Sequence, residues 1–187
     1  MPAPGVDRSL AICVGVLLIA AVAWQSFDFA RTKARWLARE LRLAEVGRWM
    51  GDAFNEFPGD PSLGVIAAGG IRMTYKGVIY DLVGLNWTAM AHARHDGAGR
   101  VRGHSGFNAE LFFGALPDIF NPVIAACDGT PYPTSRFLRN VTGGVTSDAR
   151  FRRAYRVYCW RGMRFYVRRA FYAEHIGKQR KGAGFSH

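Results

Sequence analysis

The hydrophobic positions of the chain begin with one long apolar run. Residues 10–24 carry no charged side chain, and the run is just long enough to span if Gln25 and Ser26 sit at depth, with Trp24 and Phe27 at the interface. About 20 residues at 1.5 Å per residue are needed to cross a hydrocarbon core of about 30 Å. We therefore expect a transmembrane helix over residues 9–29, after a tail of residues 1–8. One alternative is a cleaved signal peptide, because Ala21-Val22-Ala23 resembles a small-x-small cleavage site, and a weaker one is a buried core helix.

A second pattern follows directly, with apolar residues at the spacing of an amphipathic helix. Within residues 30–57 the large apolar side chains recur at steps of three, four and seven, and they are Trp36, Leu43, Val46, Met50, Phe54 and Phe57. Such a stripe predicts a helix that packs on a sheet or lies along a membrane surface. Pro58 is expected to end it, because proline cannot continue the helical hydrogen-bond ladder.

The rest of the chain alternates short strand-like and helix-like segments. Strands are predicted at residues 63–68, 78–83 and 118–125, and helices at 88–95 and 108–116. Pro122 would have to sit in an edge strand or shorten the third strand. Two further β-prone runs, 154–160 and 163–172, are separated by Arg161-Gly162, which reads as a tight hairpin turn.

This order of elements predicts the fold class. Strands separated by helices are typical of crossover units, so we expect an α/β domain over residues 58–175 with a small mixed sheet. The sheet would be partly parallel with a C-terminal antiparallel hairpin, flanked by helices and preceded by one N-terminal transmembrane helix. Residues 176–187 lack apolar periodicity and are expected to form a disordered basic tail.

Positive charge is concentrated at the C-terminal end. Residues 149–187 hold eleven Lys or Arg residues and one Glu, which gives +10 of the formal +11 of the whole chain. A basic block of this kind is typical of a solvated face, of contact with anionic lipid or polyprenyl phosphate, or of a nucleic-acid surface. No zinc-finger spacing or RNA-recognition motif accompanies it, so nucleic acid is not an expected partner.

Charge around the anchor gives an orientation that conflicts with the resemblance described below. Five cations follow the apolar run, whereas Arg8 alone precedes it; the five are Arg31, Lys33, Arg35, Arg39 and Arg42. The positive-inside rule would therefore put the C-terminal domain in the cytoplasm. Upstream spans of a longer polytopic protein would remove the conflict. Cys127 and Cys159 lie outside the apolar run, and they form either a disulfide or two buried thiols.

Several short motifs appear in the order of a known family. They are AAGGI at residues 67–71, IYDLVGLN at 79–86, AMAHA at 89–93, Gly103-His104, and LPDIF at 116–120. Together with the preceding helices they resemble the C-terminal extracytoplasmic domain of bacterial polytopic glycosyltransferases of the GT-C class, which includes arabinofuranosyltransferases that use polyprenyl-phosphate sugars. The likeness covers about residues 20–172. Trp87 stands where the family pattern usually has an acidic residue, and IRMTYKG at 71–77 replaces its aromatic-rich turn.

The resemblance implies a domain without its catalytic body. Members of the class carry the catalytic acid on a loop of a multi-span region, whereas this chain has one candidate span. We therefore expect an accessory module that binds a glycan or lipid-linked sugar in cell-envelope polysaccharide synthesis, held on the extracytoplasmic side of the cell membrane. Its expected partners are membrane lipid, a glycan or polyprenyl-phosphate sugar, and a polytopic glycosyltransferase.

Five residues are candidates to bind the substrate, and none is assigned a catalytic role. Asp81 lies near the carboxyl end of a predicted strand, where a carboxylate can face the crevice beyond that end, or can instead accept hydrogen bonds from the following turn. The other candidates line the same predicted crevice and are Asn86, His95, His104 and Ser105. No cofactor is expected.

Three alternatives stay open, and one of them is a cytoplasmic basic module that acts on nucleic acid, which the charge asymmetry across the anchor would favour. A metal-dependent hydrolase would use His92, His95 and His104, because His92 and His95 are spaced to share one helix face. The chain could also be the terminal fragment of a split glycosyltransferase. Whether the chain is an enzyme is therefore undecided. Ser105 lacks the Gly-x-Ser-x-Gly context of a nucleophile elbow.

Overall fold

The structure is a computed structural model that describes residues 8–94, 106–125, 127–128 and 136–177. The chain divides into two compact units, 1–43 and 44–187, and helix α1 (Arg8–Asn55) contributes to both. The predicted anchor and amphipathic helix are therefore parts of one continuous helix, with no break between them.

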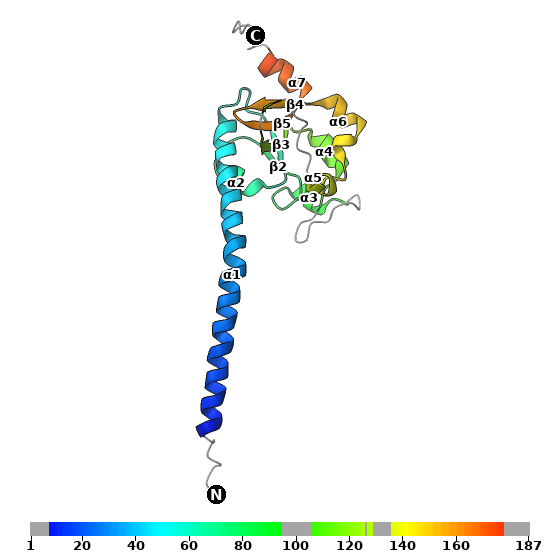
Figure 1. The fold of residues 1–187 in the computed structure, drawn as a ribbon. Helices are drawn as coiled ribbons and strands as arrows, with labels where there is room; N and C mark the ends of the chain where they lie inside the picture. Colours follow the sequence, from blue (N-terminus) through cyan, green and yellow to red (C-terminus); the bar gives the residue numbers. More distant parts are fainter. Residues whose placement is uncertain (1–7, 95–105, 126, 129–135, 178–187) are drawn as a thin grey trace. The chain divides into compact units, whose positions relative to one another are not determined.

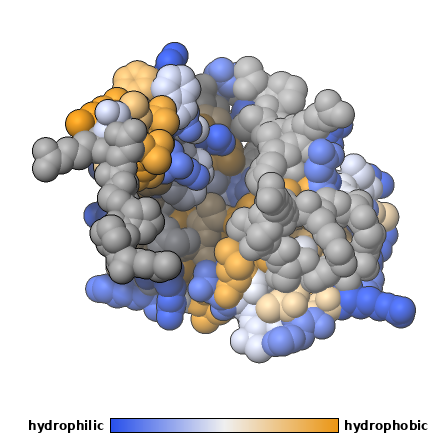
Figure 2. Space-filling model, turned by 90° about the horizontal axis from the view of Figure 1, so that it is seen from below, coloured by the Kyte–Doolittle hydropathy of each residue, from blue (hydrophilic) through white to orange (hydrophobic). Residues whose placement is uncertain are grey.

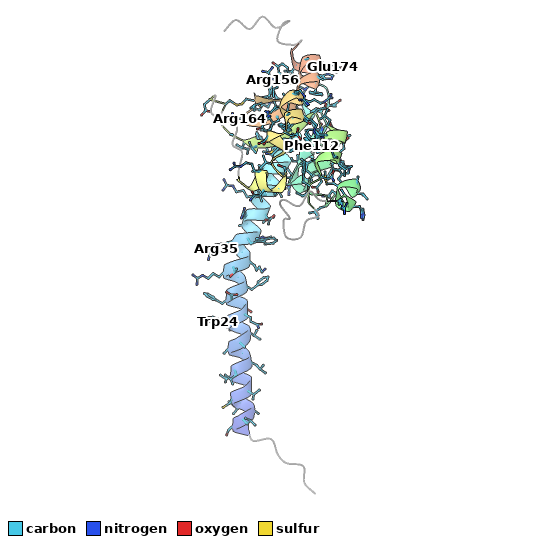
Figure 3. The ribbon with its side chains drawn as sticks, turned by 90° about the vertical axis from the view of Figure 1, so that its right-hand side faces the viewer. Trp24, Arg35, Phe112, Arg156, Arg164 and Glu174 are labelled. Carbon is cyan, nitrogen blue, oxygen red and sulfur yellow. A yellow bond between two sulfur atoms is a disulfide. The ribbon has the colours of Figure 1, made fainter. Side chains whose placement is uncertain are left out.

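The first part of α1 is long and apolar enough to cross a membrane. Its apolar side chains are exposed, with Trp24 at 74% and Leu17 at 68%. Trp24 and Arg35 project outward from the helix (Figure 3). A signal sequence near an N-terminus would have the same length and composition, so this finding supports a membrane segment without separating the two.

The second unit contains a five-stranded mixed sheet in the order β2-β1-β3-β5-β4. Strands β1 (Leu63–Val65), β2 (Ile79–Asp81) and β3 (Ile119–Ile124) are parallel. Strands β4 (Tyr155–Trp160) and β5 (Met163–Arg168) form an antiparallel hairpin, and β5 pairs antiparallel with β3. Arg161 and Gly162, both at positive φ, make the hairpin turn. The predicted mixed α/β fold, with its C-terminal hairpin, is confirmed.

Helices cover both faces of the sheet, as the ribbon in Figure 1 shows. On one face, Phe54 and Phe57 pack with Phe165 in an aromatic cluster that also includes Trp160. The other face packs against helices α4 (Ala109–Ala115), α5 (Arg136–Val141) and α6 (Ala149–Ala154). Successive strand residues point to opposite faces. Ile119 accordingly belongs to the first core and Phe120 to the second.

The amphipathic stripe of α1 is buried only in its C-terminal half. Met50 and Phe54 are 6% and 0% exposed and belong to the core, whereas Trp36 and Leu43 are 60% and 50% exposed. The predicted packing of the stripe on the sheet is therefore correct for the later positions. Exposed hydrophobic side chains occur in the second unit too, and hydrophobic and hydrophilic residues lie side by side on the face drawn in Figure 2.

The expectation for Pro122 is wrong. Strand β3 lies in the middle of the sheet, yet it keeps Pro122 within its length. The register between β3 and β5 shifts between Phe120 and Val123, and Asn121 has φ 49°. A bulge therefore accommodates the residue that cannot donate a ladder hydrogen bond, which is the remaining way to keep proline in a sheet.

Other elements differ from the expected ones in extent. The sequence patterns did not predict α2 (Ala68–Arg72) or α6, and α3 (Thr88–His92) is shorter than the helix expected there. Short helices α7 (Arg169–Phe171) and η2 (Tyr172–Ile176) follow β5, where the last β-prone run was expected to continue. The predicted tail begins in this helical region, and residues 178–187 lie outside the described residues.

A carboxylate joins the ends of three strands. Asp118, just before β3, accepts hydrogen bonds from the backbone N–H and the hydroxyl of Ser62 at 2.9 and 2.7 Å. Its other oxygen accepts from Arg168 Nε at 3.0 Å and pairs with Arg168 Nη2 at 2.5 Å. The side chains of Asp118 and Arg168 are 15% and 32% exposed. This network fixes the starts of β1 and β3 against the end of β5.

Cys127 and Cys159 form a disulfide, with a Cα–Cα distance of 5.9 Å and a sequence separation of 32. The bond joins the segment after β3 to edge strand β4, while β5 lies between those two strands. The adjacent backbone also pairs, because the N–H of Ala125 donates to the carbonyl of Gly162 at 3.1 Å. Of the two alternatives that the sequence left open for these cysteines, the structure has the disulfide.

Candidate functional site

Asp81, the last residue of β2, organises the turn after the strand. It is 2% exposed, and its Oδ1 accepts a hydrogen bond from the backbone N–H of Val83 at 3.2 Å. Its Oδ2 accepts from the backbone N–H and the side-chain amide of Asn86 at 3.0 and 3.1 Å. Both carboxylate oxygens are therefore engaged within the turn, which fits the structural alternative for Asp81. The same bonds hold the exposed Asn86 beside β2.

A pocket of about 600 Å³ lies along β2, and we call it the α2–β2 pocket. Helix α2, the segment leading into β2 and the turn after β2 all contribute to it. Its lining residues are Ala68, Arg72, Lys76, Gly77, Val78, Ile79 and Asn86. Asn86 is thus a predicted site residue that the structure brings to a cavity, and two cations that were not predicted share that cavity.

The two cations give the α2–β2 pocket a positive potential. In the part of the chain that the structure describes, neither Arg72 nor Lys76 forms an ion pair with a carboxylate. Arg72 Nη1 donates to the carbonyl of Gly77 at 3.4 Å, which leaves further guanidinium donors for a ligand. Uncompensated cations at a concave surface favour an anionic ligand, because the low-dielectric walls focus their field.

The C-terminal part of α1 holds this cationic segment in place. The side chain of Asn55 makes two hydrogen bonds to the backbone of this segment. Its Nδ2 donates to the carbonyl of Thr74 at 2.9 Å, and its Oδ1 accepts from the backbone N–H of Lys76 at 2.9 Å. The Thr74 hydroxyl donates to the carbonyl of Arg48 at 2.7 Å. Helices α1 and α2 also meet closely, since a Cβ on Gly70 would lie 2.9 Å from the Cα of Gly47. Contacts with α1 therefore fix the backbone that carries Arg72 and Lys76.

The buried side chain of Tyr75 also holds the segment that lines the pocket. Gly77 lies against the ring of Tyr75, where a Cβ would come within 2.5 Å of the phenolic oxygen. The Tyr75 hydroxyl donates to the carbonyl of Pro61. Burial, with a smaller contribution from Asp60 and Asp118, raises the pKa of Tyr75 above its ordinary value, so the phenol stays protonated as a hydrogen-bond donor.

The basic C-terminal region is partly neutralised within the fold. Arg150 pairs with Glu110 and Asp148, Arg161 with Glu56, and Arg168 with Asp118. The Arg150 hydrogen bonds are also the main reason that the pKa of Asp148 is lowered. Several arginines of this region thus have carboxylate partners within the fold. Fewer positive charges are therefore available to an external ligand than the formal charge indicates.

Three of the predicted site residues lie outside the described residues, namely His95, His104 and Ser105. His92 is exposed at the end of α3, and the other two histidines of the proposed metal set fall in that same undescribed stretch. Among the described residues, no group of three His, Cys, Asp or Glu side chains is placed to hold a metal ion. The metal-site hypothesis therefore stays a prediction.

Sequence reasoning missed Arg72 and Lys76. A signal was available in IRMTYKG at residues 71–77, which holds both cations just before β2. In the structure this segment places positive charge beside β2.

Comparisons with protein-family models, curated proteins and solved structures find no match for this chain. The resemblance to GT-C glycosyltransferases accordingly stays a prediction.

Proposed function

We propose that this chain is a membrane-anchored extracytoplasmic module that binds an anionic glycan or a lipid-linked sugar phosphate in the α2–β2 pocket. It would assist a partner glycosyltransferase in cell-envelope polysaccharide synthesis and would not transfer sugar alone. The observation that carries the proposal is the shared placement of Arg72, Lys76 and Asn86 in one cavity. The cations suit a phosphate or carboxylate, and the Asn86 side chain offers a carbonyl oxygen for a sugar hydroxyl.

The disulfide supports the extracytoplasmic side. Disulfides persist in oxidising compartments and are rare in a cytoplasm that keeps thiols reduced. The Cys127–Cys159 bond therefore weighs against the cytoplasmic orientation that the five cations after the span indicate. A partner in the membrane that fixes the direction of α1 would reconcile the two observations.

Reversing the pocket charges is expected to weaken ligand binding strongly. A hydrogen bond to a charged group contributes about 1.5–3 kcal/mol, so losing one raises Kd roughly ten- to a hundredfold. Arg72→Glu and Lys76→Glu should each do at least this, since each also introduces repulsion. Isothermal titration of the full chain in nanodiscs, with undecaprenyl phosphate and an anionic oligosaccharide as separate probes, measures the effect.

Arg169→Glu is the matched control, because Arg169 is exposed and does not line the pocket. It changes the net charge by the same amount and should leave Kd unchanged. Equal weakening by Arg72→Glu and Arg169→Glu would show that only overall charge matters. Absence of binding to both probes by the unmodified chain would refute the proposed ligand class.

A further inference from the structure

Part of α1 beyond the predicted span presents an exposed apolar stripe. Ala30, Ala34, Leu37 and Leu41 follow one another at steps of four, three and four residues, and we call this set the seam. Alternating steps of four and three residues put side chains on one side of a helix, as in two-helix pairing. Leu37 and Leu41 are 52% and 54% exposed. Within the first unit, the seam is therefore an unpartnered helix face.

The bilayer is too thin to cover this seam. The headgroup layer adds only about 5–7 Å on each side of the hydrocarbon core. If the span ends at Phe29, then Leu37 and Leu41 follow it by about 12 and 18 Å along the helix, at about 1.5 Å per residue. Both leucines therefore stand in water beyond the headgroups. A protein surface, and not lipid, is therefore what could cover them.

Charges beside the seam argue against a second copy of this chain. In a parallel pair, a residue on one flank faces the residue five positions later in the other helix. Glu40 would then face Glu45 of a second copy, and Lys33 would face Ala38. One pairing is repulsive and the other gains nothing, so identical helices lack charge complementarity.

A short seam also needs a partner held by the membrane. Four apolar positions cover only about two heptads, and helical pairing of that length is marginal in water by itself. A partner helix that also spans the bilayer is already parallel to α1 and close to it, which removes most of the cost of association. The apolar stripe and the flanking charges are thus both satisfied by a different protein that has a transmembrane helix.

We propose that residues 30–41 of α1 pair with the extramembrane extension of a transmembrane helix from a different protein. This partner helix carries acidic residues opposite Arg31 and Lys33, next to the bilayer, and a basic residue opposite Glu40, further from it. The inference needs the anchor but not the ligand pocket, so it goes beyond the proposed function and can fail separately from it.

Photo-crosslinking in native membranes tests the pairing. A photoreactive amino acid replaces Leu37 or Leu41 on the seam, and Thr32 or Arg39 on the opposite side of the helix serves as the control position. We expect adducts from Leu37 and Leu41 alone. Mass spectrometry should map each adduct to a segment of another protein that adjoins a transmembrane span and carries the complementary charges.

Charge reversal gives a second readout on the same seam. Glu40→Lys should reduce the yield of the Leu37 adduct, whereas Arg35→Glu, which lies off the seam, should leave the yield unchanged. An adduct of two copies of this chain, equal adducts from all four positions, or no adduct from membranes that contain the protein would each overturn the proposal. Titration of the same preparation with undecaprenyl phosphate reports on the pocket independently.

Discussion

Asp118→Ala is expected to destabilise the second unit by about 3 kcal/mol, because it removes the acceptor shared by Ser62 and Arg168. Breaking a buried ion pair from one side costs about 3–5 kcal/mol, since a charge is left without compensation. The partial exposure of Arg168, at 32%, favours the lower end of that range. The loss also frees the backbone N–H and hydroxyl of Ser62. Urea unfolding of the full chain in detergent, followed by tryptophan fluorescence, measures the change.

Glu110→Ala provides the comparison for an exposed ion pair. Glu110 bonds Arg150 at 2.8 Å, but the two side chains are 76% and 42% exposed. Exposed pairs contribute little because water and salt screen them. The Glu110 variant should therefore unfold at the same urea concentration as the unmodified chain. A similar loss of stability in both variants would show that the Asp118 network has no special role.

Removing the Cys127–Cys159 bond is expected to cost a further large amount, about 3–4 kcal/mol. A crosslink between residues 32 positions apart restricts the unfolded chain, and closure of a loop of that length corresponds to this value. The double variant Cys127→Ser, Cys159→Ser should unfold at lower urea than the oxidised chain, and it should respond no further to reductant.

Cys13→Ser is the control for this experiment, because Cys13 is a free and exposed cysteine in the apolar part of α1. It should keep the full stability and the full sensitivity to reductant. If the oxidised chain and the double variant had equal free energies of unfolding, the disulfide would not contribute to the stability of the fold.

Local patterns in the sequence were enough to predict most of the sheet. The β-branched and aromatic runs gave β2, β3 and the hairpin, and Arg161-Gly162 gave its turn. These features depend on neighbours in the chain, so they can be read without a structure. The sheet order depends instead on long-range packing. The prediction for Pro122 was wrong for that reason. Local rules exclude proline from an ordinary central strand, and the bulge is visible only in the pairing of β3 with β5.

The candidate site was harder to predict than the fold. Asn86 was identified from a motif, but its cavity depends on residues up to 18 positions earlier in the chain, which α2 brings alongside β2. Helix α2 has only five residues and contains Gly69 and Gly70, so it carries no clear periodicity. Its position depends on contacts with the C-terminal part of α1, such as that between Gly70 and Gly47. Arg72 and Lys76 could therefore not be assigned to a pocket from sequence alone.

Counting free thiols in whole cells tests most directly on which side of the membrane the second unit, which we call the head, folds. Cells expressing the full chain are quenched with acid, denatured and treated with a maleimide mass tag, with or without prior reduction. The chain has three cysteines. A retained anchor with an extracytoplasmic head predicts one tag before reduction, on Cys13, and three after it. Three tags before reduction would mean that the head is reduced and cytoplasmic. No tag before reduction would mean that the segment with Cys13 had been cleaved. Either result would contradict the account.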